Sequence, residues 1–457
     1  MKRTNRILPV YAADISGICS ALYELGGMTV MHDASGCNST YTTHDEPRWY
    51  SMDSMVYISA LSELEAVMGD DEKLVRDIVD AAVNLGPAFI CIGGTPIPMM
   101  MGTDFKGIAR IVEDKTGIPA FGIAANGMHS YVRGAGEAFR WIVKRFCPAG
   151  VKADHLSGKA GLLSGKADYL SGKAGLLSGK AGLLSEKADL PAGTELAGAE
   201  QPAVGQPAAL KVNILGVTPL DFSLTGNTAR LKDFPRSHGM ETVGCWAMES
   251  GLDELRMAGQ ADVNLVVSAV GLPAASELKQ MYGTPYVVGT PVGRRTSGRL
   301  AECIRQAAQT GENQSLFEGA GNVVPVDAAA SLRPDLGLSG LPDDLSGRKV
   351  LIIGEQVIAG SLRCSLQEEF GADQVRVLCP TEGEADLAVE GDIIDWDEDE
   401  VIRAIGESAV VVADPLYRQV CPAGRNILFV DFPHEACSGR MYHSIMRPFV
   451  WAPDDSV

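Results

Sequence analysis

The stretch Gly17–Cys37, GICSALYELGGMTVMHDASGC, contains two cysteines in a setting that decides how the rest of the chain is interpreted. Its residues predict a short helix directly after Cys19, a Gly-Gly break, an apolar strand at Met28–Met31 and a polar turn that ends at Cys37. Both cysteines are therefore expected at the edges of regular structure, beside glycines that let the backbone approach closely. Thiolates that hold an iron–sulfur cluster need such positions, with backbone N–H groups nearby. On spacing alone, two half-buried packing cysteines are the simpler interpretation.

Length and composition favour a multidomain α/β protein. The 457 residues suffice for about three domains, and 51 glycines suit many tight strand-to-helix turns. The ten cysteines form no C-x-x-C pair, which argues against a zinc ribbon or a secreted disulfide framework. No apolar run reaches the roughly 18 residues of a membrane span, and Asp14 interrupts the apolar patch at the start, which makes a poor export signal. We therefore expect a reducing cytoplasm, where cysteines can serve as metal ligands.

The charge of the chain limits its partners. A net charge of −19 disfavours nucleic acid and anionic membranes, because both would be repelled. Ten carboxylates and no base lie between Glu382 and Glu400. A solvated loop and helix face is the simpler interpretation of this run, and a docking surface for a basic partner is the alternative.

Alternating apolar and amphipathic segments predict three Rossmann-like, doubly wound α/β units with parallel sheets. The first unit covers residues 1–149, the second residues 211–315 and the third residues 347–457, with a linker at residues 316–346. The expected strands include Pro87–Gly93, Pro119–Ile123, Lys211–Val217, Asp262–Val270 and Arg348–Glu355. The expected helices include Ser20–Leu25, Glu72–Asn84, Asp104–Lys115, Gly136–Phe146 and Ser297–Thr310.

Residues 150–210 are of a different kind. The unit LSGKAGL recurs with variations every seven residues, from Leu156 to Leu184. A coiled coil is disfavoured because each glycine costs about 1 kcal/mol in a helix. We therefore expect a tandem-duplicated, low-complexity surface insertion without a catalytic role.

The motifs, taken in order, resemble those of a subunit of the nitrogenase component 1 family. This family includes the molybdenum-iron protein chains, dark-operative protochlorophyllide reductase subunits and the nickel-sirohydrochlorin reductive cyclase. The resemblance rests on Cys19, His32–Cys37, Ser62–Leu74, Gly127, Tyr282–Tyr286 and Pro433–Arg440. It covers nearly the whole chain except the repeat insertion. It implies three Rossmann-like units that pair across a two-fold or pseudo-two-fold axis, with an iron–sulfur cluster between the subunits.

The chain also departs from the family pattern. Gly94-Thr95-Pro96 stands where the nitrogen-reducing chains have a third cluster cysteine, and Cys91 is the nearest substitute. Ser268 stands where the alpha chain has its cofactor cysteine, and His434 lies close to the position of the cofactor histidine, one residue out of spacing. A nitrogenase-type heterometal cofactor, and with it dinitrogen reduction, is therefore not expected.

The remaining ligands suggest how a cluster is shared. A [4Fe–4S] cluster takes four thiolates. Cys19 and Cys37, in a loop shaped by His32 and Gly36, supply two per chain, so a second copy or a sister component 1-like subunit would complete the set. The resemblance further implies an ATP-dependent reductase similar to the nitrogenase iron protein as the electron donor.

The substrate site is expected where the three units converge, at the C-terminal ends of their strands. Arg294 and Arg295 are candidates for binding the carboxylates of a tetrapyrrole-like substrate, with solubility arginines as the alternative. His434 and Arg440 are the candidate catalytic residues, His434 as a proton donor or an axial ligand of a second metallocofactor. Met99–Met101 are expected as cavity lining or core. The function expected is a reductase subunit; a cluster-assembly scaffold or carrier without turnover is the alternative.

Overall fold

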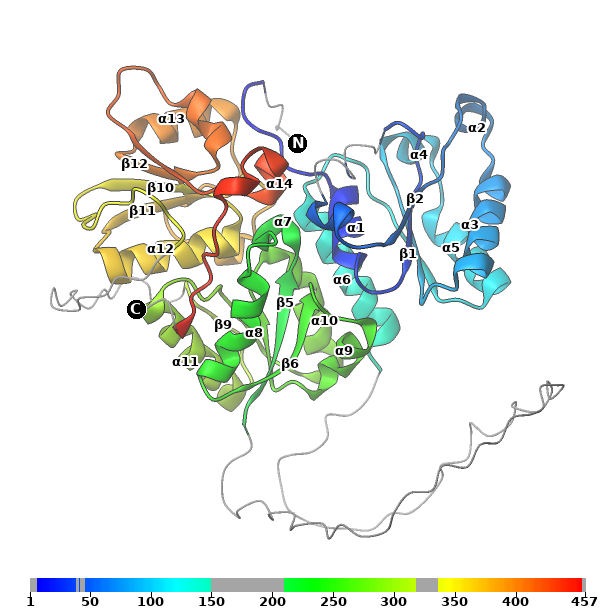
Figure 1. Cartoon of the computed structure of the whole chain (residues 1–457), viewed down its shortest axis with the longest axis horizontal. Coiled ribbons are helices and arrows are strands. Elements are labelled where there is room, and N and C mark those ends of the chain that lie inside the picture. The colour runs from blue at the N-terminus through cyan, green and yellow to red at the C-terminus, as the bar shows by residue number, and fades with distance from the viewer. Residues whose placement is uncertain (1–5, 38–40, 42–45, 149–208, 318–335, 454–457) are drawn as a thin grey trace, which may run out of the picture. The chain divides into compact units, whose positions relative to one another are not determined.

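The computed structural model describes residues 6–37, 41, 46–148, 209–317 and 336–453. These residues form three parallel sheets with helices between their strands (Figure 1), which confirms the predicted α/β class with three doubly wound units. The repeat insertion and the central part of the predicted linker lie outside the described residues. Within the described part of the chain, no helix is long and apolar enough to cross a membrane.

The first sheet has the strand order β2-β1-β3-β4. Its strands are β1 (Met28–Met31), β2 (Met55–Ile58), β3 (Ile90–Gly93) and β4 (Ala120–Ile123). Its helices are α1 (Asp14–Leu22), α2 (Glu63–Met68), α3 (Asp71–Leu85), α4 (Pro96–Met101), α5 (Phe105–Thr116) and α6 (Tyr131–Phe146), with a 3-10 turn η2 (Pro47–Tyr50). Since β1 pairs with β2 on one side and β3 on the other, the order in which strands are added to the sheet reverses between β1 and β3. We call this the point where the sheet changes direction.

The second sheet has the order β6-β5-β7-β8-β9. Its strands are β5 (Lys211–Val217), β6 (Glu241–Ala247), β7 (Val263–Val266), β8 (Tyr286–Val288) and β9 (Gln314–Ser315). Its helices are α7 (Pro219–Phe222), α8 (Asn227–Ser237), α9 (Leu252–Arg256), α10 (Leu272–Tyr282) and α11 (Arg294–Thr310). A 3-10 turn, η4 (Ala269–Gly271), leads from β7 to α10. The change of direction in this sheet falls between β5 and β7.

The third sheet has the order β11-β10-β12-β13. Its strands are β10 (Lys349–Ile353), β11 (Gln374–Leu378), β12 (Val410–Ala413) and β13 (Leu428–Asp431). Its helices are α12 (Gln356–Phe370), α13 (Glu398–Glu407) and α14 (Glu435–Ser438), followed by the turn η7 (Gly439–Met441). The change of direction falls between β10 and β12.

The helices begin and end where local chemistry dictates. Asp70 and Asp104 accept N–H groups at the first turns of α3 and α5, as N-cap carboxylates do. Both helices end at a glycine with positive φ, Gly86 and Gly117, a conformation that other residues adopt at a cost. Their buried apolar faces pack on the first sheet because both helices are amphipathic.

Helices α1 and α6 pack with their backbones in contact. A Cβ on Gly17 would lie 2.1 Å from the carbonyl oxygen of Tyr131, and a Cβ on Gly134 would lie 1.8 Å from that of Asp14. Only glycine fits at either position. This contact explains why α1 runs from Asp14 through Gly17, so the prediction that the helix follows Cys19 is wrong.

Other boundaries also differ from the predictions. Helix α6 begins at Tyr131 rather than Gly136, and α11 begins at Arg294 rather than Ser297. Strand β7 ends at Val266, so the predicted continuation to Val270 is wrong: Ser268 leaves the sheet and η4 follows. In each case tertiary packing overrides a local pattern that sequence alone leaves ambiguous.

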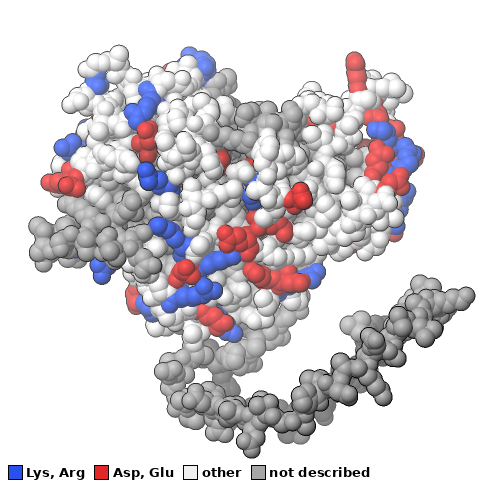
Figure 2. Space-filling view, in the orientation of Figure 1, with Lys and Arg blue, Asp and Glu red and all other residues white. Residues whose placement is uncertain are grey.

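The acidic run after Glu382 is partly structural. Asp392 is buried in an ion pair with Arg363, 2.7 Å apart, and Glu398 accepts the backbone N–H groups of Arg6, Ile7 and Leu8. Acidic and basic side chains lie next to one another in groups at the lower centre and the right edge of the face drawn in Figure 2, which is otherwise largely uncharged. The interpretation of the run as a solvated surface is therefore wrong for Asp392 and Glu398.

Candidate functional site

The loop after β1 is fixed at the point where the first sheet changes direction. The backbone N–H of His32 donates to the Gly93 carbonyl (3.0 Å), and the Thr95 hydroxyl donates to the His32 carbonyl (2.8 Å). Nδ1 of His32 pairs with the Ser59 hydroxyl at 2.8 Å. Burial lowers the pKa of His32, although the nearby Asp71 and Asp33 carboxylates oppose this shift. His32 therefore orders this loop.

The two predicted cluster cysteines have different surroundings. Cys37 is exposed on a turn closed by its N–H to the Ala34 carbonyl, and a Cβ on the neighbouring Gly36 would meet no atom within 4 Å. Cys19 is 0% exposed within α1, in the same core as Tyr41. The expectation of an accessible edge position is correct for Cys37 and wrong for Cys19, because α1 starts at Asp14 and carries Cys19 into the core.

These surroundings test whether an iron–sulfur cluster fits. An exposed thiol beside open space suits a ligand shared with a second chain, so Cys37 fits, whereas Cys19 would need its surroundings to rearrange. Cys91 is fully buried in β3, and burial raises the pKa of its thiol well above the usual range, which disfavours the thiolate. Among the described residues, no group of three or more His, Cys, Asp or Glu is placed to hold a metal ion.

A buried ion network lies beside α1, the helix that carries Cys19. The Arg48 guanidinium in η2 donates to Glu46 (2.6 Å), Glu24 (2.7 Å) and the Ser20 carbonyl (2.8 Å). Arg48 is 3% exposed, so its charge is compensated by these carboxylates rather than by water. The network ties η2 to α1. No sequence signal predicted it, because residues 38–49 have the composition of an ordinary polar loop.

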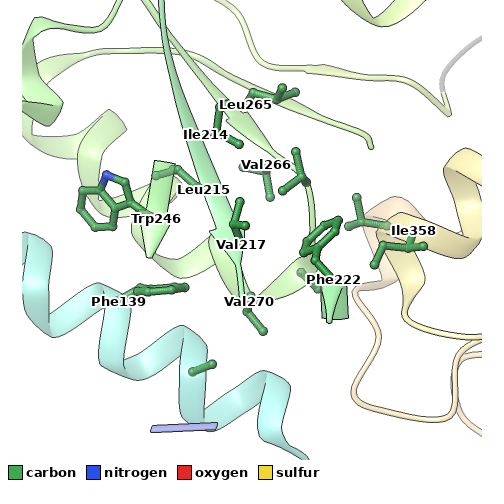
Figure 3. Close-up of a cluster of buried hydrophobic side chains, with 14 of the residues drawn as sticks. Phe139, Ile214, Leu215, Val217, Phe222, Trp246, Leu265, Val266, Val270 and Ile358 are labelled. Carbon is green, nitrogen blue, oxygen red and sulfur yellow. The ribbon is translucent and has the colours of Figure 1, made fainter. Parts of the chain in front are cut away.

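A second buried network, the central network, is built around Asp221 in α7, just after β5. One oxygen of this carboxylate, Oδ1, accepts the Tyr131 hydroxyl and lies 3.5 Å from Nε2 of His434. The other oxygen accepts the hydroxyls of Ser268 (2.7 Å) and Thr218 (3.3 Å). The apolar side chains of Val217, Phe222, Val270 and Ile358 pack around the same end of β5 (Figure 3).

Glu355 extends the central network into the third sheet. It follows β10 and caps α12, accepting the N–H groups of Val357 (3.1 Å) and Ile358 (2.9 Å). It also accepts the N–H of Ala269, the residue after Ser268, at 3.0 Å. Burial and the nearby Asp221 carboxylate raise the pKa of Glu355 to about 7. The side chain therefore changes protonation near neutral pH.

His434 reaches the central network from the third sheet. Its backbone N–H donates to Asp414 at 2.9 Å, and its ring lies against those of Tyr11 and Tyr131, with centroids 5.5 and 5.9 Å away. Its Nδ1 is buried without a hydrogen-bond partner among the described residues, as is Oε1 of Glu435. Burial raises the pKa of Glu435. Such buried unpaired atoms mark a place where a ligand or water is expected.

The central network lies at the strand ends of the second and third sheets, beside α6 of the first unit, whereas the sequence predicts the substrate site where all three units converge. Asp221 and Ser268 follow β5 and β7, and Glu355 and Asp414 follow β10 and β12, so hydrogen bonds join the points where the second and third sheets change direction. Ligands of open α/β sheets bind at such points. A sequence signal was available, because these polar residues closely follow apolar strands, but only His434 was selected from this region.

The other predicted site residues lie elsewhere or are incompletely described. At the start of α11, the N–H of Arg295 donates to Glu369 (3.1 Å) and its guanidinium to the Glu368 carbonyl (3.3 Å), which joins α11 to α12. Arg294 occupies the first position of α11. Arg440 lies in η7, and its side chain is outside the described structure.

Two cavities lie away from the central network. A groove of about 690 Å³ runs between α3 and α5, with Val75, Val79, Ile108 and Ile111 among its lining residues. A void of about 10 Å³ borders His32, Ser59 and Lys73, which is room for about one water molecule. The groove lies on the outer helices, so its size alone does not make it the reaction site.

Three parallel sheets with a buried polar network at their strand ends define a multi-sheet α/β protein, and the matching family is that of nitrogenase component 1 type oxidoreductases. The family model of that name matches residues 25–412, and the chain belongs to this family. The resemblance inferred from the motifs is thus confirmed.

Two curated relatives match part of the sequence. The chain is 27% identical over 172 residues to a light-independent protochlorophyllide reductase chain of Nostoc punctiforme, covering 37% of this chain and 33% of that protein. It is 21% identical over 324 residues to the nitrogenase iron-molybdenum cofactor biosynthesis protein NifE of Klebsiella pneumoniae, covering 70% of this chain and 59% of that protein. The match to the reductase thus spans about a third of that relative's length.

A solved structure shares the fold. A chain of the structure titled "Nitrogenase Cp1 at pH 6.5" superimposes with a TM-score of 0.58 at 15% identity, covering 98% of this chain and 91% of that chain. The likeness therefore extends over all three sheets.

Proposed function

We propose that this chain is a component 1-type reductase subunit that shares a [4Fe–4S] cluster with a second subunit and reduces a bound substrate other than dinitrogen. The observation that carries the proposal is the central network, in which polar side chains from the ends of strands in two sheets meet α6 in one buried place. A buried group of this kind brings together side chains that can donate and accept protons.

The cluster is assigned to Cys37 and Cys19 of two chains. Four thiolates hold a [4Fe–4S] cluster, and each chain supplies two. Cys37 is exposed and ready for this role; Cys19 is buried in the same core as Tyr41, so binding through Cys19 requires a local rearrangement. When bound, the cluster supplies single electrons at low potential.

The face beside Cys37 supports a protein partner. Residue Leu61, just before α2, donates its N–H to Asp33, and Thr95, just before α4, bonds to His32, so both helices start beside the cysteine loop. These helices present exposed apolar side chains: Leu64, Val67, Met68, Met99 and Met100 are 71%, 78%, 74%, 50% and 89% exposed. Met99–Met101 are expected from the sequence as cavity lining or core, and the assignment to the core is wrong for Met99 and Met100.

Exposed apolar side chains clustered beside a functional loop mark interaction sites. We assign this face to the second component 1-like subunit and, for electron delivery, to an ATP-dependent iron-protein-like reductase. In the central network, His434 is the catalytic residue proposed, with Arg440 a few residues further along the chain. Arg294 and Arg295 remain proposed ligands for substrate carboxylates of a tetrapyrrole-like molecule, the class to which the substrate in the reductase relative's name belongs.

A cluster-assembly scaffold or carrier is the second candidate function. It is favoured by the relative NifE, named for cofactor biosynthesis, whose alignment covers 70% of this chain. A reductase consumes electrons and ATP with a bound substrate. A scaffold instead passes its cluster to a recipient protein and shows no turnover.

The test is anaerobic purification with iron and sulfide analysis and EPR. We expect about four irons per dimer, lost in Cys37→Ala and retained in the control Cys421→Ala, which replaces a partly exposed cysteine of the third unit. Wild-type dimer without iron would overturn the proposal. Transfer of the cluster to an apo-acceptor without substrate turnover would replace the reductase by the scaffold.

A further inference from the structure

The two ring nitrogens of His434 have different surroundings. Nε2 lies 3.5 Å from Oδ1 of Asp221 and 3.5 Å from the Tyr131 hydroxyl. Nδ1, on the other side of the ring, is buried without a partner among the described residues. His434 is only 7% exposed, so a small part of the side chain contacts bulk water. One nitrogen is thus held by the protein and the other is left for a ligand.

The carboxyl group of Asp221 is surrounded by hydroxyl groups that can donate hydrogen bonds. Its two oxygens accept hydroxyl hydrogen bonds from Tyr131, Ser268 and Thr218 within the described structure. An ionised carboxylate has only acceptor sites, so this donor set matches it. An ionised Asp221 in turn favours a proton on the facing Nε2 of His434.

Tyr131 completes the arrangement as a hydrogen-bond donor. Burial, together with the Asp221 and Glu355 carboxylates, raises the pKa of Tyr131 well above its usual value. The phenol therefore keeps its proton at neutral pH and donates a hydrogen bond to Asp221. Its role is to hold the carboxylate.

We propose that Asp221 is a positioning residue that fixes the proton of His434 on Nε2 and thereby leaves Nδ1 to deliver protons to a bound substrate. The inference rests on the proposed reductase function. It names two residues, Asp221 and Tyr131, that the sequence motifs did not identify. A carboxylate that orients a histidine ring through one nitrogen while the other reacts is a recurrent arrangement in enzymes.

The proton transfer balances with the proposed reduction. Two electrons and two protons convert a double bond of the substrate into a single bond. The electrons come one at a time from the ATP-dependent iron-protein-like reductase. For each proton, the Nδ1–H bond of the His434 imidazolium breaks as a C–H or N–H bond forms on the substrate. The imidazole is left neutral with its proton on Nε2, facing Asp221, and takes up the next proton from solvent.

The groups around His434 are compatible with this exchange. Tyr11 packs edge-on against the ring, Tyr131 and Asp221 face Nε2, and Asp414 is engaged with the backbone N–H of His434. Glu435 interacts electrostatically with the imidazole and is itself held by the Ser223 hydroxyl at 2.9 Å. Among the described residues, no hydrogen bond occupies Nδ1.

The experiment is ¹⁵N NMR of histidine-labelled protein, with steady-state kinetics on the assembled enzyme. In wild type above the imidazole titration, we expect the His434 signals of the Nε2–H tautomer. In Asp221→Asn, whose amide can also donate, we expect a mixture of tautomers, a kcat lowered about 10- to 100-fold, and an unchanged iron content and KM. The matched control is Asp392→Asn, which removes a buried carboxylate paired with Arg363 outside this network. It should lower thermal stability without moving the His434 signals.

The outcomes separate the inference from the proposed function. If Asp221→Asn leaves both the tautomer and kcat of an active enzyme unchanged, the inference is overturned while the reductase function stands. If His434 is the Nδ1–H tautomer in wild type, the inference is overturned as well. If the wild-type protein has no cluster and no turnover, the proposed function fails, and the NMR comparison still decides whether Asp221 sets the tautomer.

Discussion

At the edge of the first sheet, Cys37 is exposed and Cys19 is buried in α1, whereas at the central network Asp221, Ser268 and His434 are all buried and in contact. The first region has a clear sequence motif but an incomplete set of ligands. The second has a weak motif and an extensive set of hydrogen bonds. We infer that the cluster site depends on a second chain, while the proton-handling site is formed within one.

The largest effect expected is on metal content. Cys37→Ala should remove essentially all iron from the dimer, yet change the free energy of unfolding of the metal-free chain by no more than about 0.5 kcal/mol, because the side chain is exposed. Iron analysis and chemical denaturation of the apo-protein measure the two quantities. Iron retained in this variant would contradict the assignment of Cys37 as a cluster ligand, since Cys37 would then be a surface residue only.

The buried ion network beside α1 should be the next most sensitive. Arg48→Met leaves Glu46 and Glu24 without their guanidinium partner and should lower the free energy of unfolding by about 3–5 kcal/mol. The double variant Arg48→Met/Glu46→Leu removes one of the stranded charges and should recover part of this loss. Urea denaturation tests both. An unchanged midpoint for the single variant would show that η2 does not hold α1 in place.

Glu355 should make stability depend on pH. Its folded-state pKa is raised from 4.5 to about 7, so the folded protein binds this proton more tightly than the unfolded chain does. Its contribution is therefore fully present below pH 4.5 and is lost as the pH rises through about 7.

Glu355→Gln tests this dependence by denaturation at pH 5 and pH 8. The variant should lose less stability than wild type between these two conditions. The free energy of unfolding still changes with pH in both proteins, because burial also raises the pKa values of Asp14, Glu369 and Glu435. Equal slopes in variant and wild type would contradict the assignment.

Ser268→Ala should have the smallest effect. It removes one of the hydroxyls that donate to Asp221 and leaves the Tyr131 and Thr218 bonds in place, so a loss of about 1 kcal/mol in stability is expected. Its kcat should fall less than that of Asp221→Asn. A larger fall in kcat than in Asp221→Asn would place the reactive proton on the serine rather than on His434.

The fold could be predicted well because buried parallel strands appear in the sequence as short apolar runs. Strands β1 and β5 occur with the predicted bounds, Met28–Met31 and Lys211–Val217. The course of α1 was missed because Gly17 is typical of a helix break, and its reason for being glycine, the close approach of α6, exists only in three dimensions.

The site was predicted less completely, because its residues also come together only in the folded structure. His434 could be selected by resemblance, but its partners Tyr131 and Asp221 lie far away in sequence and meet it only through the packing of α6, α7 and the segment after β13. Conversely, Cys19 and Cys37 are close in sequence, which made them easy to pair and concealed their different burial.

The most direct measurement is iron content as a function of oligomeric state. Anaerobic size-exclusion chromatography with light scattering separates monomer from dimer, and each fraction is analysed for iron. The account predicts iron only in species with at least two component 1-like chains, at about four atoms per pair. A monomer that carries a full cluster would contradict the claim that the cluster site is completed by a second chain.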